Sequence, residues 1–364
     1  MSFYVDVDKI KLKVDEFFDV EDIFFEAGVL TFLVSNREIK ERFRRLYREL
    51  KPMGYIPTAV RSGEGVALRI FPAPKVRLPM PKLKSLPLIL FIATLGTVSI
   101  DGFLRASSPV YQLIVGKVTL FDRIVEGILF TVALMAIIGI HELGHKFSAK
   151  VDGVESSPPY FIPGIPTILP TFGAVIFQKS PIVNRDDMFD AGFSGPVTGF
   201  LAAVVVTVIA YLKAFWFTPA EFQVLMAKIE KAGGMGLPSP LIFYVFRPLF
   251  GRPNMVPIFT TIGFAAWLGM LITALNLFPV WQLDGGRIFR SLLNARQHRI
   301  ASYISIGVLA LTGYLFFAIL LLILMPRTPD IAPLDQVSPL SRMRRLAFIA
   351  VFAIMVLTFV PLWI

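Results

Sequence analysis

Cysteine is absent from the 364-residue sequence, and histidine occurs only three times, as His141, His145 and His298. Without cysteine the chain has no disulfide framework, no thiolate metal site and no cysteine nucleophile. Any bound metal ion must therefore be held by histidine, aspartate or glutamate. Charged residues are also scarce, at 17% of the chain, against about 25% in ordinary soluble domains.

Apolar residues make up 55% of the sequence, and the mean hydropathy is +0.68. These values indicate a membrane protein. The net charge of +10 would also suit a nucleic-acid-binding protein. However, the basic residues lie mainly between apolar segments, where they attract anionic lipids and set the topology. We therefore expect a lipid bilayer as a partner and no nucleic acid.

The chain divides into three predicted parts. Residues 1–73 are predicted to form a small soluble α+β domain, because a helical pattern and β-rich runs alternate there. The expected order is a strand at 28–34, a helix at 37–51, and a hairpin formed by 55–60 and 66–72. Residues 74–85 are a basic, proline-rich linker, and residues 86–364 are the membrane domain. The first residues contain no apolar core of a signal peptide.

The membrane domain is predicted to be a mostly α, polytopic helix bundle of about six transmembrane helices, in a range of six to eight. Each expected span is an apolar segment long enough, or nearly long enough, to cross a bilayer. The six segments are 86–103, 124–148, 190–215, 256–280, 300–325 and 345–364. Residues 157–178 are apolar but rich in proline, which excludes a regular helix. A re-entrant, β-rich loop is expected there.

The second span contains His141-Glu142-Leu143-Gly144-His145, the HExxH pattern. Positions i and i+4 of a helix share one face, so both imidazoles can bind one zinc ion. Glu142 lies where it can take a proton from a zinc-activated water. Ionisable residues are costly within a span, which favours a functional role over a structural histidine cluster.

A catalytic zinc ion needs a third protein ligand and one open position. His298 is one candidate, although its basic surroundings suggest an ordinary surface histidine in a loop, and a glutamate on another helix is a further option. Asp284 is the preferred candidate, because it follows Pro279 at the end of an apolar span. The two glycines after it allow close backbone approach. The alternative is a plain helix exit and turn.

The predicted topology supports Asp284. The second and fourth spans run in the same direction, so both motifs lie on the same side of the bilayer. The basic linker favours a cytoplasmic N-terminus. We therefore expect an integral, multi-pass protein of a prokaryotic plasma membrane, with its active site toward the cytoplasm.

The pairing of HExxH with Asn276-x-x-Pro279-x-x-x-x-Asp284-Gly285 resembles the site-2 protease family of intramembrane zinc metalloproteases, peptidase family M50. Stretches between residues 158 and 196 resemble more narrowly the branch that contains EGY-like proteins. This resemblance implies one zinc ion per chain held by His141, His145 and Asp284, with Glu142 as general acid and base. It also implies a substrate-contacting or oxyanion-contacting role for Asn276.

One segment departs from the family pattern. Many members have Gly-Pro-x-x-Asn after the catalytic span, whereas this chain has Gly195-Pro196-Val197-Thr198-Gly199. The resemblance implies hydrolysis of peptide bonds in transmembrane segments, as in regulated intramembrane proteolysis. The partner is then a transmembrane protein or peptide substrate, and the sequence does not fix the oligomeric state. Residues 171–178 are expected to offer a strand edge to an unwound substrate.

Other classes of function remain open at this point. A membrane zinc or ion transporter also places histidine and aspartate in spans, but the other spans are nearly free of polar residues. A silent zinc-binding scaffold would not require Glu142. Three acidic residues before the third span, Asp186, Asp187 and Asp190, suit capping of that helix better than a second metal site.

Overall fold

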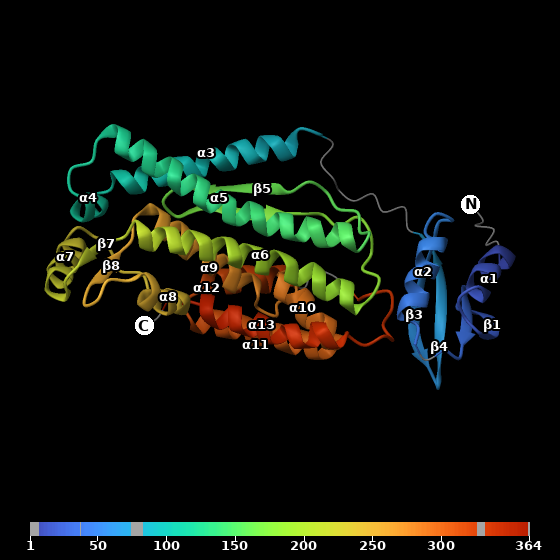
Figure 1. The fold of residues 1–364 in the computed structure, drawn as a ribbon. Coiled ribbons are helices and arrows are strands. Elements are labelled where there is room, and N and C mark those ends of the chain that lie inside the picture. Colours follow the sequence, from blue (N-terminus) through green and yellow to red (C-terminus); the bar gives the residue numbers. More distant parts are fainter. Residues whose placement is uncertain (1–6, 37, 74–82, 326–331, 363–364) are drawn as a thin grey trace.

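A computed structural model describes residues 7–36, 38–73, 83–325 and 332–362. Within these ranges the protein is mostly helical, with thirteen helices and three small sheets. Most of the predicted linker, residues 74–82, lies outside the described residues. Figure 1 shows an N-terminal domain beside one end of a long helical bundle.

The N-terminal domain pairs two helices with a four-stranded antiparallel sheet in the order β1-β2-β4-β3. Its elements follow one another along the chain: α1 (Val7–Asp15), β1 (Val20–Glu26), β2 (Val29–Val34), α2 (Lys40–Leu50), β3 (Tyr55–Ser62) and β4 (Gly65–Pro72). The strands and the helix expected from the sequence are present. Two further elements, α1 and β1, were not predicted. Most side chains of β1 are exposed, so this edge strand has no clear alternation of apolar residues.

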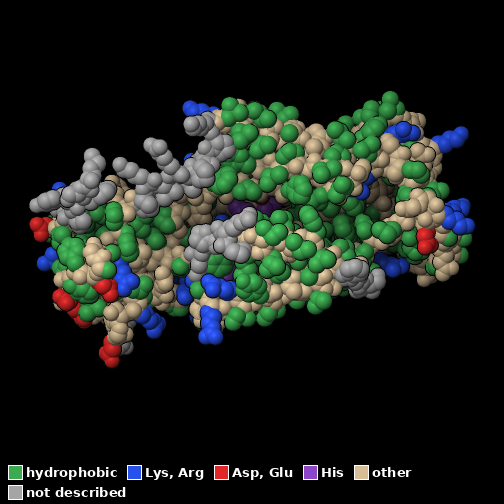
Figure 2. All heavy atoms as spheres, turned by 180° about the vertical axis from the view of Figure 1, so that it is seen from behind, with side chains coloured by type: hydrophobic (Ala, Val, Ile, Leu, Met, Phe, Trp, Pro, Cys, Tyr) green, Lys and Arg blue, Asp and Glu red, His purple; other side chains and the backbone are tan. Residues whose placement is uncertain are grey.

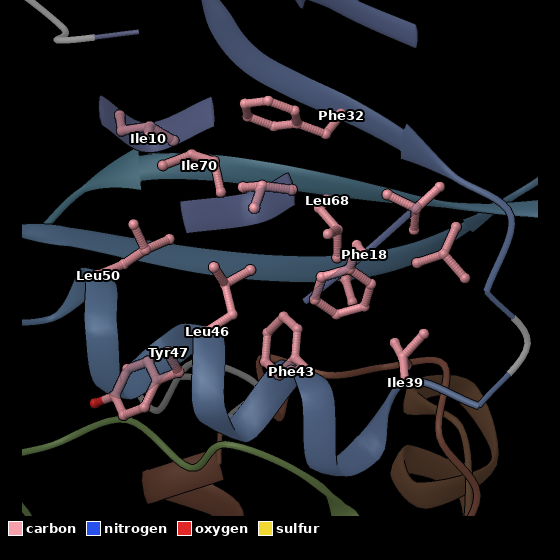
Figure 3. Packing of buried hydrophobic residues seen from close by; sticks show 14 of the residues in the cluster. Ile10, Phe18, Phe32, Ile39, Phe43, Leu46, Tyr47, Leu50, Leu68 and Ile70 are labelled. Atoms are coloured by element: carbon pink, nitrogen blue, oxygen red, sulfur yellow. The ribbon is translucent and has the colours of Figure 1, made fainter. Parts of the chain in front are cut away.

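The core of this domain lies between α2 and the sheet (Figure 3). Phe43, Leu46 and Leu50 recur at helical spacing on α2 and are fully buried. They pack against strand residues that include Phe32 and Leu68. The same cluster includes Val183, which comes just before α6 (Arg185–Leu212) of the membrane domain. This hydrophobic cluster therefore joins the N-terminal sheet and helices to the segment just before α6.

Three helices of the bundle are long and apolar enough to cross a membrane: α3 (Leu86–Ser107), α5 (Leu120–Val151) and α6. In Figure 1 they lie side by side along the bundle, and α5 packs against both α3 and α6. The bundle surface in Figure 2 is largely hydrophobic, and basic and acidic side chains gather toward its ends. This distribution is the one expected for a protein surrounded by lipid.

The remaining predicted spans contain shorter helices. They are α9 (Thr261–Asn276), α11 (Ala295–Leu311), α12 (Leu315–Leu324) and α13 (Arg342–Thr358). The expected span at 300–325 is interrupted at Gly313, whose φ of 98° is incompatible with a continuous helix. Among the described residues, three helices therefore meet the length and hydropathy expected of a span, and the predicted number of six is not reproduced by this criterion.

The proline-rich segment after α5 forms a two-stranded antiparallel hairpin of β5 (Tyr160–Ile165) and β6 (Leu169–Val175). The hairpin packs mainly against α3. Thr97 donates from Oγ1 to the Pro170 carbonyl oxygen at 2.9 Å, and the buried Asp101 carboxylate accepts from the Thr167 backbone N–H. The hairpin is thus fixed at its turn, while residues 174–176 line a cavity together with the C-terminal part of α5.

Short elements close the opposite end of the bundle in Figure 1. They are α4 (Pro109–Val115), α7 (Pro219–Lys231), α8 (Leu241–Phe250) and the paired strands β7 (Phe215–Phe217) and β8 (Val256–Ile258). Between α9 and α11 lies a further short helix, α10 (Asp284–Leu292), which packs against α6. The site described next lies where α5, α6 and α10 meet.

Candidate metal centre

The HExxH motif lies near the C-terminal end of α5. His141 and Glu142 are 6% and 7% exposed, and His145 is partly buried. The i and i+4 spacing places both imidazoles on one face of this helix, and their ring centroids lie 4.9 Å apart. A continuous, apolar helix therefore carries two histidines and a carboxylate into the protein interior.

Asp284 reaches the same place through a tight connection after α9. The helix ends at Asn276, three residues before Pro279, which cannot continue it. The chain then turns and begins α10 at Asp284. A Cβ atom at Gly285 would lie 2.2 Å from the Leu277 carbonyl oxygen, so only glycine permits this close return. The segment Asp-Gly-Gly thus opens a helix, and the alternative of a plain turn after a helix exit is wrong.

The three side chains converge on one point. The Nε2 atoms of His141 and His145 lie 3.1 Å apart, and Asp284 Oδ2 lies 3.3 and 3.2 Å from them. A tetrahedral zinc ion with ligands at about 2.0–2.1 Å separates its ligand atoms by about 3.3 Å. The triangle of two nitrogens and one oxygen therefore fits one zinc ion, with the fourth position open. Among the described residues this is the single group of three or more such side chains arranged to hold a metal ion.

The orientation of His145 is set by a backbone carbonyl on α6. His145 Nδ1 lies 2.9 Å from the Ala191 carbonyl oxygen. A carbonyl oxygen can only accept a hydrogen bond, so the nitrogen that faces it must carry the hydrogen. This contact assigns the hydrogen to Nδ1 and leaves the Nε2 lone pair directed at the other two ligands. Hydrogen bonding of this kind fixes both the tautomer and the ring plane of a metal-binding histidine.

Helix α6 presents glycines to both imidazoles. A Cβ atom at Gly195 would lie 2.1 Å from His145 Nε2, and one at Gly199 would lie 2.9 Å from His141 Nδ1. Residues 195 and 199 share one helix face. Gly199 is the position at which this chain departs from the Gly-Pro-x-x-Asn pattern, and here it touches a predicted ligand. This role was not predicted, although the spacing of glycines on an apolar helix indicates close packing.

A cavity of about 220 Å³ opens at the three side chains. Its walls come from α5, the β6 edge, the start of α6 and the connection between α9 and α10. Figure 2 shows histidine side chains at the bottom of a hollow between two hydrophobic surfaces. Asn276 and Glu142 both line the cavity, so the structure brings all five predicted site residues together. Two charged lining residues, Asp152 and Arg287, were not predicted.

Asp152 caps the C-terminal end of α5, outside the apolar part of that helix. Its pKa is raised above the ordinary value, first because burial penalises the charged carboxylate and second because Asp190 is nearby.

His298 is placed differently from the expectation. It lies on α11, is 1% exposed, and packs against the Trp281 ring at a centroid distance of 4.8 Å. The prediction of a surface histidine in a loop is therefore wrong, because an aromatic side chain covers it. It is also not among the residues that line the cavity at the predicted ligands.

The three aspartates at the start of α6 form ion pairs. Asp187 pairs with Arg44 of α2, Asp190 pairs with Arg344 of α13, and Asp186 pairs with Lys40 and Arg344. Asn184 caps the helix by accepting from the backbone N–H groups of residues 186 and 187. The acidic residues thus neither cap α6 through their side chains nor belong to the metal-binding group found among the described residues. They join distant parts of the chain.

Comparison with known proteins gives the family. The model for peptidase family M50 matches residues 129–321, more than half of the chain and including every predicted site residue. The chain therefore belongs to peptidase family M50, and the resemblance stated from the motifs is confirmed. No solved structure matches the chain significantly.

The curated relatives are plant proteins named as zinc metalloproteases. A probable zinc metalloprotease EGY2, chloroplastic, of Oryza sativa subsp. indica is 25% identical over 279 residues, which is 70% of this chain and 46% of that protein. The EGY1 protein of Oryza sativa subsp. japonica is 32% identical over 237 residues, covering 63% and 40%. The EGY1 protein of Arabidopsis thaliana is 29% identical over the same length, covering 63% and 42%. The chain thus spans less than half the length of these relatives, and their names agree with the predicted class of zinc metalloprotease.

These names also correct one prediction. We expected a prokaryotic plasma membrane with the active site toward the cytoplasm. The relatives are chloroplastic plant proteins, which point to a chloroplast membrane instead. The error arose because composition and the charge of a linker do not identify an organelle.

Proposed function

We propose that the protein is an intramembrane zinc endopeptidase that hydrolyses peptide bonds of transmembrane segments. The observation that carries this proposal is the triangle of His141, His145 and Asp284 beside the buried Glu142, at the end of a membrane-length helix. A zinc transporter or a silent scaffold would need the three ligands but would not need the Glu142 carboxylate beside them.

Zinc bound at this site would supply a Lewis acid that polarises a carbonyl group and makes a neighbouring water more acidic. His141, His145 and Asp284 would hold it, and the Ala191 carbonyl directs the His145 Nε2 lone pair toward the other two ligands. Glu142 accepts a proton as the water oxygen attacks the scissile carbonyl carbon. It then passes a proton to the leaving nitrogen as the carbon–nitrogen bond breaks. Asn276, in the cavity wall, donates a hydrogen bond to the developing oxyanion.

The substrate must be extended where it is cut, because a helix hides its amides in backbone hydrogen bonds. Residues 174–176, at and just after the end of β6, line the cavity, and β6 has one strand partner in its two-stranded sheet. We propose that an unwound substrate segment pairs with this edge, which presents its carbonyl groups to the metal centre. We also propose that a soluble N-terminal domain ends at residue 73, that a linker ends at residue 85, and that the membrane domain has six spans.

The test measures metal content and cleavage on the purified protein in detergent. The wild type is expected to hold one zinc ion per chain and to cut a generic transmembrane substrate. A chelator should abolish cleavage, and added zinc should restore it. Replacing Glu142 by glutamine should reduce cleavage by about 10²–10⁴-fold, the usual contribution of a general acid and base, while zinc content stays unchanged. Zinc binding without cleavage of any substrate would favour the transporter or scaffold instead.

A further inference from the structure

Arg287 differs in charge from the other residues of the catalytic cavity. Of the residues lining the cavity in the described parts of the chain, it is the one lysine or arginine, and the other charged side chains apart from the histidines are acids: Glu142, Asp152, Asp187 and Asp284. Two of these acids already have partners, since Asp187 pairs with Arg44 and Asp284 lies against the two histidines. No hydrogen bond or ion pair joins Arg287 to any residue that the structure describes.

The position of Arg287 brings it close to the reacting atoms. It lies in the first turn of α10, three residues after Asp284, and positions i and i+3 of a helix are neighbours on one face. The next residue, Ile288, packs toward Gly192 of α6 and is fully buried. The helix is therefore held against α6 by Ile288, and Arg287 projects on the side of the cavity.

The cavity is long enough to hold several substrate residues. It follows α5 from Glu142 to Asp152, a rise of about 15 Å. An extended peptide advances about 3.3 Å per residue, so four to five residues fit along this length. Side chains next to the scissile bond therefore lie within the cavity, and successive ones point to opposite faces of the strand.

We propose that Arg287 is a specificity-determining residue that binds a substrate carboxylate carried within two positions of the scissile bond. A planar guanidinium group matches a carboxylate through two parallel hydrogen bonds, and a partly desolvated cation gains more from an anion than from a neutral carbonyl. Because Arg287 is the one lysine or arginine among the described residues that line the cavity, the preference is confined to one position. This inference rests on the proposed function.

The test uses matched substrates. The cut position of one transmembrane substrate is mapped first, and then glutamate or glutamine is placed at each of the two positions on either side. In the wild type, glutamate at one position should raise kcat/KM about tenfold or more over glutamine. Arg287→Gln should bring this ratio to within about twofold of one, because a charged hydrogen bond is lost. Arg299→Gln is the control, since Arg299 is exposed on α11 outside the cavity wall.

Binding provides a readout that does not need cleavage. In the Glu142→Gln background, fluorescence anisotropy of labelled peptides should show the same preference for glutamate, and Arg287→Gln should remove it. Arg287→Lys should retain part of the preference, which tests the idea even where the glutamine variant folds poorly. Peptides with a free or an amidated C-terminus distinguish a terminal carboxylate from a side-chain carboxylate.

Equal glutamate-to-glutamine ratios for wild type and Arg287→Gln, in both cleavage and binding, would overturn the inference and leave the proposed function standing. A wild-type protein that binds zinc and prefers glutamate peptides but cuts none would overturn the proposed function alone.

Discussion

At the scale of single residues, the site depends on a few atoms held against each other by different parts of the chain. His141 and His145 come from one helix, Asp284 from another, and the acceptor for His145 Nδ1 is a backbone carbonyl of a third. A buried carboxylate beside two imidazoles is stable only when a cation or a proton compensates its charge. The zinc ion of the proposed function would supply this compensation.

The third ligand can be tested directly. Asp284→Ala should lower zinc affinity by more than about 100-fold, because even the loss of a hydrogen-bond partner of a ligand costs about 10–100-fold. His298→Ala should retain zinc, since His298 lies against Trp281 rather than in the cavity wall. Metal per chain is measured after dialysis against a weak chelator. Zinc retained by Asp284→Ala would move the third ligand to another residue.

At the scale of elements, the close packing of α6 on α5 decides whether the imidazoles can converge. Gly195→Ala would place a methyl group 2.1 Å from the position of His145 Nε2. We expect zinc content and cleavage to fall together. This loss is expected even though alanine stabilises a helix by about 1 kcal/mol relative to glycine. Gly139→Ala, on α5 with open space around the added atom, is the matched control. Equal zinc content in the two variants would show that α6 moves aside freely.

The β5–β6 hairpin offers a second test at this scale. The Asp101 carboxylate accepts hydrogen bonds from Arg105 and from the Thr167 backbone N–H. Thr167 has a φ of 70°, and the hydrogen bond to Asp101 helps to maintain this uncommon conformation. Asp101→Ala should free the hairpin turn and raise KM several-fold with a smaller change in kcat, if the hairpin docks substrate. Asp101→Asn retains an acceptor and should remain closer to the wild type. Steady-state cleavage in detergent measures both constants, and an unchanged KM in Asp101→Ala would argue against docking at this hairpin.

At the scale of the whole molecule, the N-terminal domain is anchored beside the end of the bundle that contains the candidate metal centre. Backbone hydrogen bonds join Ala59 of β3 to Leu334, and Leu334 in turn to Ile182 before α6. Arg44 pairs with Asp187, whose carboxylate is nearly fully buried and lines the cavity at the candidate metal centre. The domain therefore forms part of the support for α6, the helix that orients His145.

Breaking this anchor should destabilise the protein. Arg44→Ala leaves the Asp187 carboxylate buried without its partner, which costs about 3 kcal/mol. Lys51→Ala, which removes a pair with the exposed Glu155, should cost less than about 1 kcal/mol. Thermal unfolding in detergent compares the two variants, and cleavage assays show whether the metal centre follows. Equal unfolding temperatures would mean that the buried pair contributes no more than the exposed one.

Much of this protein was determined by the sequence alone. Composition required a membrane environment, and the i and i+4 spacing of HExxH placed both imidazoles on one helix face, because that periodicity is local. The strands and helix of the N-terminal domain followed from short-range patterns, except the exposed edge strand β1 and the helix α1. Pro279 and two glycines correctly indicated a chain break and a close approach near Asp284.

Only the tertiary structure decided the features that join distant segments. These features are contacts between separate elements: the ligand triangle, the carbonyl that orients His145, the glycine face of α6 and the burial of His298 by Trp281. The acidic residues at the start of α6 were predicted to cap that helix, whereas the structure pairs them with Lys40, Arg44 and Arg344. Periodicity shows which face of an element is apolar, but it does not show which other element covers that face, because packing partners are selected over the whole chain.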